Sequence, residues 1–115
     1  MTKLRGSAAI VGIGLAGIPE MPAGSTPVDC MGLAALGALK DAGIAPEEVD
    51  GVFASGLQML MPALNLTEYL GLQPRYVDGT QVGGCAPLVQ LNHARAAIAA
   101  GLCEVALIAY GSTQK

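Results

Sequence analysis

The sequence predicts an α/β fold in which helices alternate with apolar strands along the chain. Short apolar runs of strand length alternate with longer segments in which apolar residues recur at helical spacing. Glycine and proline separate these segments, with 16 glycines and 7 prolines among 115 residues. Alternation of this kind is typical of a parallel sheet that is covered by helices.

The first half of the chain predicts two strands with one long helix between them. Residues 7–14 are a continuous apolar run bounded by glycine, which predicts a buried strand. Thr26 and Asp29 then stand at the positions of an N-cap and a capping-box acid, with a proline directly after the N-cap. The helix that begins there ends at Gly43, its predicted C-cap. Residues 49–54 predict the second strand.

The second half predicts two helices and two extended segments. Residues 63–70 follow a proline and end before a glycine, as a short helix does. Residues 76–82 read as an extended segment, and residues 86–100 as the third helix. Residues 105–110 are a continuous apolar run, from which we expect a central strand of the sheet.

The third predicted helix is apolar nearly all round. Its larger apolar residues mark one face, namely Leu88, Leu91, Ile98 and Leu102. Small apolar residues make up much of the remainder. A helix of this kind is normally buried on several sides, so we expect it to lie inside a layered structure.

The composition is more apolar than that of a small domain that stands alone. Hydrophobic residues make up 52% of the chain and charged residues 13%. A chain of this length buries a modest core, so the excess predicts faces that further chain or a partner subunit covers. We therefore expect residues 1–115 to be a partial N-terminal domain whose C-terminal half is absent, and to be inactive alone.

Charge and cysteine usage exclude several classes of function. A net charge of −3, with six Lys and Arg, does not predict a nucleic-acid-binding surface. No apolar run approaches the length of a membrane span, and the first residues lack a signal-peptide cleavage context. The three cysteines show neither a disulfide framework nor metal-ligand spacing. We expect a cytoplasmic protein with no metal and no permanently bound cofactor.

A glycine pattern after the first predicted strand matches a dinucleotide-binding fingerprint but not its context. Gly12, Gly14 and Gly17 have the spacing G-x-G-x-x-G. The fingerprint needs a helix that begins at the motif, and Pro19 and Pro22 prevent a helix interior there. We interpret this stretch as a glycine-rich loop that shapes the wall of a pocket.

The most informative stretch is GGCAP at residues 83–87. Paired glycines let the backbone turn sharply, and Pro87 suits the first turn of the helix that follows. Cys85 is thereby placed at a helix start, where free N–H groups and the positive end of the helix dipole activate a thiol as a nucleophile. The alternative interpretation is a small apolar residue that fills a tight turn.

These segments, in this order, resemble the N-terminal half of the thiolase superfamily, especially its sterol-carrier-protein-type and lipid-transfer-type members. The resemblance covers the whole chain. It rests on AAIVGIG at residues 8–14, LKDAGIAPEEVDGV at 39–52, GGCAP at 83–87 and HARAAIAAGLCEVALIAYGS at 93–112. It implies a layered α-β-α-β-α fold built from two similar halves, of which this chain covers most of the first.

The resemblance also implies an acyltransferase of the acetyl-CoA acetyltransferase type, active in lipid, fatty-acid or sterol metabolism. In that family a cysteine at the start of the central helix takes the acyl group from a coenzyme A thioester, the substrate. The active-site histidines and a second, acid/base cysteine come from the C-terminal half. The expected partner is a second copy in a homodimer, or in a tetramer, or a small partner subunit. Residues 76–82 are where such dimers commonly pair strands.

The chain departs from the family at the nucleophile. The usual motif is Asn-x-x-Cys-x-Ser-Gly, whereas residues 80–88 read TQVGGCAPL. Counted back from the helix end, the family's cysteine falls at Gly84, one residue before Cys85. Either Cys85 is the nucleophile after a shorter turn, or Gly84 occupies the slot and Cys85 is a bystander.

Two alternatives to the acyltransferase follow from this departure. Some lipid-transfer-type members lack the cysteine and act as carbon–carbon lyases beside a small partner protein. The chain would then belong to a lyase that cleaves a β-hydroxyacyl-CoA by retro-aldol chemistry. The other alternative is a non-catalytic subunit that binds lipid or serves as a scaffold.

Overall fold

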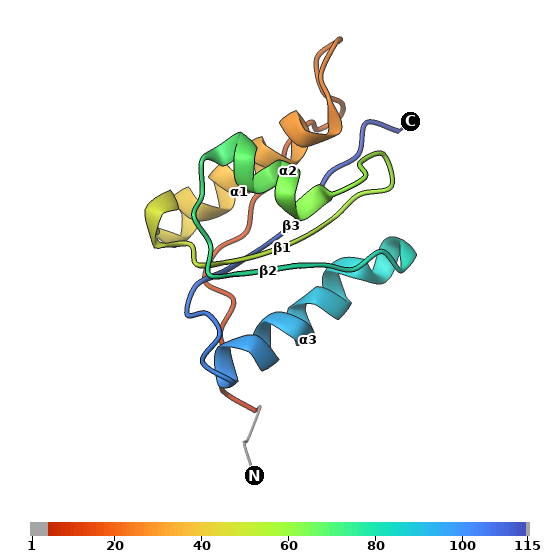
Figure 1. Ribbon diagram of the computed structural model, residues 1–115. Helices are drawn as coiled ribbons and strands as arrows, with labels where there is room; N and C mark the ends of the chain where they lie inside the picture. The colour runs from red at the N-terminus through yellow and green to blue at the C-terminus, as the bar shows by residue number, and fades with distance from the viewer. Residues whose placement is uncertain (1–4, 115) are drawn as a thin grey trace.

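Three parallel strands form the sheet of this computed structural model, which describes residues 5–114 (Figure 1). The strands are β1 (Gly51–Ser55), β2 (Tyr76–Gly79) and β3 (Ala106–Tyr110). Their order in the sheet is β2-β1-β3, and Val52 of β1 lies opposite Val77 and Leu107. All of β1 is buried, because it has a strand on each side and helices on both faces.

Helices cover both faces of this sheet, as Figure 1 shows. The helices are α1 (Pro27–Ala42), α2 (Pro62–Leu70) and α3 (Ala86–Ala99), and two 3-10 turns are η1 (Pro46–Glu48) and η2 (Gly83–Cys85). α1 and α2 pack on one face, and α3 packs on the other. Each of the three α-helices begins and ends within one residue of the range that the sequence predicts. The predicted α/β class is confirmed.

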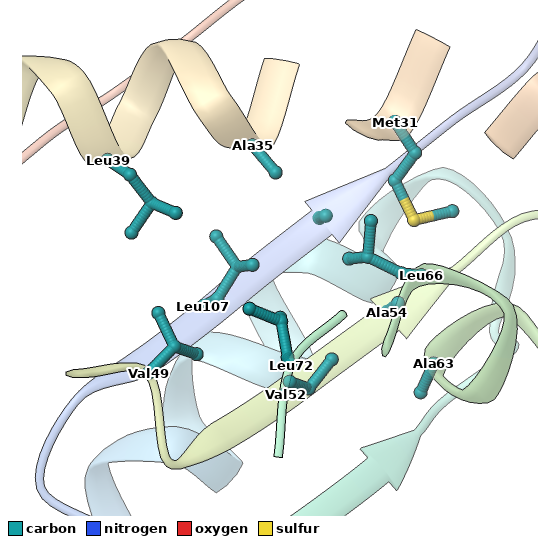
Figure 2. Packing of buried hydrophobic residues seen from close by; sticks show 11 residues of the cluster. Met31, Ala35, Leu39, Val49, Val52, Ala54, Ala63, Leu66, Leu72 and Leu107 are labelled. Atoms are coloured by element: carbon teal, nitrogen blue, oxygen red, sulfur yellow. The ribbon is translucent and has the colours of Figure 1, made fainter. Parts of the chain in front are cut away.

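The larger core lies between the sheet and the pair α1 and α2 (Figure 2). Side chains of α1 point toward the strands, and side chains of α2 pack beside those of α1. The labelled members are Met31, Ala35, Leu39, Val49, Val52, Ala54, Ala63, Leu66, Leu72 and Leu107. This core fixes two helices to β1 and β3, and so holds the sheet from one side.

The capping box predicted for α1 is present. The Thr26 hydroxyl accepts a hydrogen bond from the Asp29 N–H at 3.2 Å, and the Asp29 carboxylate accepts one from the Thr26 N–H at 2.8 Å. The bond from the Thr26 backbone is the main cause that holds the pKa of Asp29 below its ordinary value. At the other end Gly43 adopts a left-handed φ of 69°, as a glycine C-cap does.

The place of β3 corrects one expectation. Residues 105–110 were expected to form a central strand, but among the described residues β3 is an edge strand that pairs with β1 alone. Its apolar character comes from cover on both faces, because Leu107 packs toward α1 and α2 while Ile108 packs toward α3. A continuous apolar run therefore indicates buried faces here and not a central position.

The face of α3 that packs on the sheet is formed mostly by small residues, with Ile98 half-buried beside them. The residues buried against the rest of the fold are Ala86, Gln90, Ala94 and Ala97. Leu88 lies on another face and is 71% exposed. Small side chains let the helix approach the sheet closely, and Phe53 of β1 fills the space between them. Within the described residues, α3 is therefore covered on one face and not on several.

The predicted first strand is not a strand. Residues 7–14 belong to no helix or strand of the described chain and pass along α1 instead. A Cβ atom on Gly12 would overlap the carbonyl oxygen of Ala38, and one on Gly14 would overlap that of Ala34. The Ile13 N–H donates to the Asp41 carboxylate of α1 at 3.0 Å. The glycines of the run make the close contact with α1, whereas Ile10, Val11 and Ile13 are exposed, and no described strand lies beside the run to pair with.

This contact predicts opposite effects for two glycine-to-alanine changes. Gly14→Ala should destabilise the protein by about 1–3 kcal/mol, because the new methyl group meets α1 backbone atoms that cannot move aside. Gly37→Ala should stabilise it by about 0.5–1 kcal/mol, because Gly37 lies within α1. Its Cβ would make an ordinary contact with the Gly14 Cα at 3.7 Å. Denaturant unfolding of both variants measures this, and shifts of equal sign would contradict it.

None of the helices formed by residues 5–114 combines the length and the hydropathy that a membrane crossing requires.

Candidate functional site

The turn η2 carries both candidate site residues, Gly84 and Cys85, to the start of α3. Gly83 opens the turn with a φ of 83°, a left-handed conformation that favours glycine. The Ala86 N–H donates back to the Gly83 carbonyl, so the turn runs directly into the helix. The structure thus places Cys85 at the N-cap position of α3, where the sequence predicts a helix start.

The Cys85 thiol is exposed and lies against its own turn. Its Sγ atom donates to the Val82 carbonyl oxygen at 3.4 Å. The N-cap of α3 makes no side-chain hydrogen bond to the first helical turn. The Ala86 N–H is already bonded to the Gly83 carbonyl and Pro87 has no N–H, so what favours negative charge at the thiol is the positive end of the α3 dipole. An exposed thiol at this place can act as a nucleophile.

Gly84 faces open space. A Cβ atom built on it would meet nothing within 4 Å, and its φ is not in the left-handed region. The backbone therefore does not require glycine at this position, and a larger side chain fits there. The slot that the thiolase resemblance assigns to the nucleophile is thus open and carries no functional group, whereas the adjacent Cys85 does.

Two glutamines join the three loops at the carboxyl edge of the sheet, which sequence reasoning missed. Gln81, in the loop after β2, pairs with the backbone of Gly56 directly after β1. Gln58, in the loop after β1, bonds to Ser112 and Thr113 after β3. The sequence alone carries no signal for these pairs, because which loops meet depends on the strand order and register, although glutamine can both donate and accept.

Two buried polar side chains lie beneath α3. Gln90 is 0% exposed and Ser55 is 1% exposed, and neither side chain has a hydrogen-bond partner among the described residues. Both belong to the side of the sheet on which Phe53 packs against Ala94. Ser55 lies two residues beyond Phe53 on the strand, and Gln90 lies one helical turn before Ala94. The two side chains therefore occupy the same layer, toward the start of α3.

Cys85 and Gly84 line neither of two hollows found in the surface of residues 5–114. One, of about 660 Å³, is formed by residues 16–17 and 19–25, Cys30 and residues 112–114. Of the three glycines of the G-x-G-x-x-G pattern, Gly17 lines this hollow, whereas Gly12 and Gly14 lie against α1, and no helix begins at any of them. The other, of about 420 Å³, lies between β2 and α3 beside His93.

Among residues 5–114, no three His, Cys, Asp or Glu side chains gather as metal ligands would.

Several solved structures are similar to this chain. The Ltp2–ChsH2(DUF35) aldolase is 25% identical with a TM-score of 0.73, over 87% of this chain and 26% of that one. OleA of Xanthomonas campestris with bound lauric acid and lauroyl-CoA is 22% identical with a TM-score of 0.73, over 80% and 29%. The 3-oxoacyl-(acyl carrier protein) synthase III, FabH, of Xanthomonas oryzae pv. oryzae is 22% identical with a TM-score of 0.72, over 80% and 29%.

These similar structures identify the fold of the chain. They do not identify its family type, its partners or its location, which stay predictions. No protein-family model and no curated protein sequence matches the chain. The chain spans less than a third of the length of each of these three structures. The sterol-carrier or lipid-transfer type, the homodimer, the small partner subunit and the cytoplasmic location stay predictions. With its parallel sheet between α1, α2 and α3, the chain has a thiolase-like α/β fold.

Proposed function

We propose that this chain is part of a thiolase-fold enzyme that acts on acyl-CoA thioesters, and that Cys85 carries the acyl group. The observation that carries the proposal is an exposed thiol on the turn that opens α3. The similar structures support the substrate class, since OleA is seen with lauroyl-CoA and FabH is named as a 3-oxoacyl-(acyl carrier protein) synthase.

The proposed reaction takes place in two steps. The Cys85 thiolate attacks the carbonyl carbon of the acyl-CoA, its S–C bond forms, and the C–S bond to coenzyme A breaks. The thiol proton passes to a base in the C-terminal half, as the resemblance to thiolases implies. A carbanion of a second substrate then attacks the Cys85 thioester, which forms a carbon–carbon bond and releases the thiolate. The positive end of the α3 dipole favours the negative charge that develops nearby.

Mass spectrometry of the full-length protein tests this proposal. After incubation with acetyl-CoA or lauroyl-CoA, we expect the mass of the acyl group on the peptide that contains Cys85, and its loss in Cys85→Ser. Cys103 is an internal control, because it is buried and burial raises the pKa of its thiol. Absence of the adduct, together with full activity of Cys85→Ser, would exclude Cys85 as the acyl carrier.

A carbon–carbon lyase is the second candidate. The Ltp2–ChsH2(DUF35) aldolase matches more of this chain than OleA or FabH does, 87% against 80%. In this candidate Gly84 occupies the nucleophile slot, which is open in the structure. A base takes the proton of the β-hydroxyl group, the bond between the α and β carbons breaks, and the acyl-CoA leaves as its enolate. No covalent intermediate forms, so cleavage of a β-hydroxyacyl-CoA would proceed unchanged in Cys85→Ser.

A further inference from the structure

We propose that Gln81 is the positioning residue for the turn that carries Cys85, an inference that rests on the function proposed above. Gln81 lies in the loop between β2 and α3, two residues before η2 begins. Its side chain binds the backbone of Gly56 and not the thiol. Its role is therefore to fix where the turn stands relative to the sheet.

The Gln81 amide is held by two hydrogen bonds to one residue. The Gly56 N–H donates to Gln81 Oε1 at 3.0 Å, and Gln81 Nε2 donates to the Gly56 carbonyl oxygen at 3.2 Å. Both bonds are partly buried. Because the two bonds use both ends of the amide, they restrict its orientation as well as its distance. The pair therefore ties the loop after β2 firmly to the end of β1.

This pair extends the register of the sheet beyond its last backbone pairing. β1 and β2 pair with a constant offset that places Ala54 opposite Gly79. Two residues further on, the same offset places Gly56 opposite Gln81. The backbone pairing of β1 with β2 ends before this point, yet Gly56 and Gln81 are joined by hydrogen bonds from the Gln81 side chain. The Gln81 side-chain amide thus replaces the backbone hydrogen bonds of a strand pair. The main chain of residue 81 is therefore free to turn away from the sheet toward α3.

The loop after Gln81 needs such a fixed point. Val82 is followed by Gly83 and Gly84, and glycine has the greatest backbone freedom of any residue. The Cys85 side chain bonds to Val82, within the same loop, and so adds no tie to the sheet. Gln81 therefore sets the starting point of a flexible turn whose end carries the thiol.

The loop after β1, to which Gln81 is bonded at Gly56, is in turn bonded to the loop after β3 through Gln58. Gln58 Oε1 accepts from the Thr113 N–H at 2.7 Å and from the Ser112 hydroxyl at 3.0 Å. Gln58 Nε2 donates to the Thr113 hydroxyl at 3.2 Å. The loops after β2, β1 and β3 are thus joined in the same order as their strands, which gives Gln81 a fixed support.

The variant Gln81→Met in the full-length protein tests the inference. Methionine keeps the length of the side chain and removes both hydrogen bonds. We expect kcat for acyl-CoA conversion to fall about 100-fold with KM little changed, because a displacement of about 1 Å of a reacting group costs that much. We also expect faster hydrogen exchange of the amides of residues 82–86, whereas a purely stabilising role would leave this local exchange unchanged relative to the rest of the fold.

Arg75→Met is the control at a distance from the turn, although it also removes an ion pair with Asp50, whose carboxylate lies 3.7 Å from Arg75 Nε. Arg75 also makes two side-chain bonds to the backbone, to the carbonyl oxygens of Gly101 and Leu102, but at the opposite edge of the sheet. Equal losses of kcat in both variants, or unchanged exchange at residues 82–86 in Gln81→Met, would overturn the inference. If Gln81→Met does not fold, Gln81→Glu keeps the acceptor for the Gly56 N–H and tests the same two quantities.

Separate measurements test the proposed function and the role of Gln81. If wild-type protein forms no acyl adduct on Cys85, the acyltransferase proposal fails. The hydrogen exchange of residues 82–86 in Gln81→Met, compared with Arg75→Met, still decides whether Gln81 positions the turn.

Discussion

Replacing Cys85 by alanine should lower the rate of acyl transfer by about 1,000-fold or more, because the nucleophile that carries the acyl group is lost. The free energy of unfolding should change little. Cys85 is exposed, and its thiol makes one weak bond, to a carbonyl of its own turn. Steady-state kinetics with acetyl-CoA and lauroyl-CoA, beside denaturant unfolding of the same preparation, measure the two effects separately.

A second variant moves the thiol by one position. Gly84→Cys combined with Cys85→Ala should fold, because a side chain at position 84 meets open space. It should not restore acyl transfer, since one residue at a helix start rotates a side chain by about 100°. Restored activity would show that position 84 is the nucleophile slot and that Cys85 is a bystander. Full activity of Cys85→Ala alone would instead favour the lyase.

Phe53→Ala should destabilise the protein by about 3–5 kcal/mol, the usual cost of removing a fully buried phenylalanine. Phe53 is 0% exposed and lies at the centre of β1. It packs against Ala94 and Ala97 of α3, and its ring lies 5.7 Å from that of Tyr76. Because the opposing face of α3 is made of small residues, the side chains of that helix cannot fill the cavity.

Phe53→Leu is the control for this effect. Leucine keeps most of the apolar volume, so its cost should be clearly smaller than that of alanine. Chemical denaturation of the two variants and the wild type gives both differences. A cost for Phe53→Ala below about 1 kcal/mol would show that the α3 side of the sheet repacks, against the tight packing described above.

Local signals in the sequence predicted the helices and the site turn well. The capping box at Thr26 and the glycine C-cap at Gly43 need no knowledge of the tertiary structure, because capping is made by residues a few positions apart. The same holds for GGCAP, whose glycines and proline set the local backbone around Cys85. These were the features that the structure reproduced within a residue.

Features that depend on distant contacts were not predictable in this way. The apolar run at residues 7–14 predicts a strand, yet Gly12 and Gly14 pack directly against backbone atoms of α1. The leucines of α3 mark one face of the helix in the sequence, yet mainly alanines and Gln90 are buried against the sheet, opposite Phe53. The Gln81–Gly56 pair joins residues 25 positions apart, and that spacing becomes visible only once the strand register is known.

The strand order β2-β1-β3 makes the chain reverse its direction across the sheet. From β1 the chain moves outward to β2, and from β2 it returns past β1 to β3. Right-handed crossovers place the connecting helices on opposite faces when the direction reverses, which is why α2 and α3 lie on different sides (Figure 1). The loops that leave β1 and β2 therefore diverge to opposite sides, and open α/β sheets bind ligands at such a topological switch point. The chirality of the polypeptide thus places the Cys85 turn at the carboxyl edge of the sheet, beside this switch point.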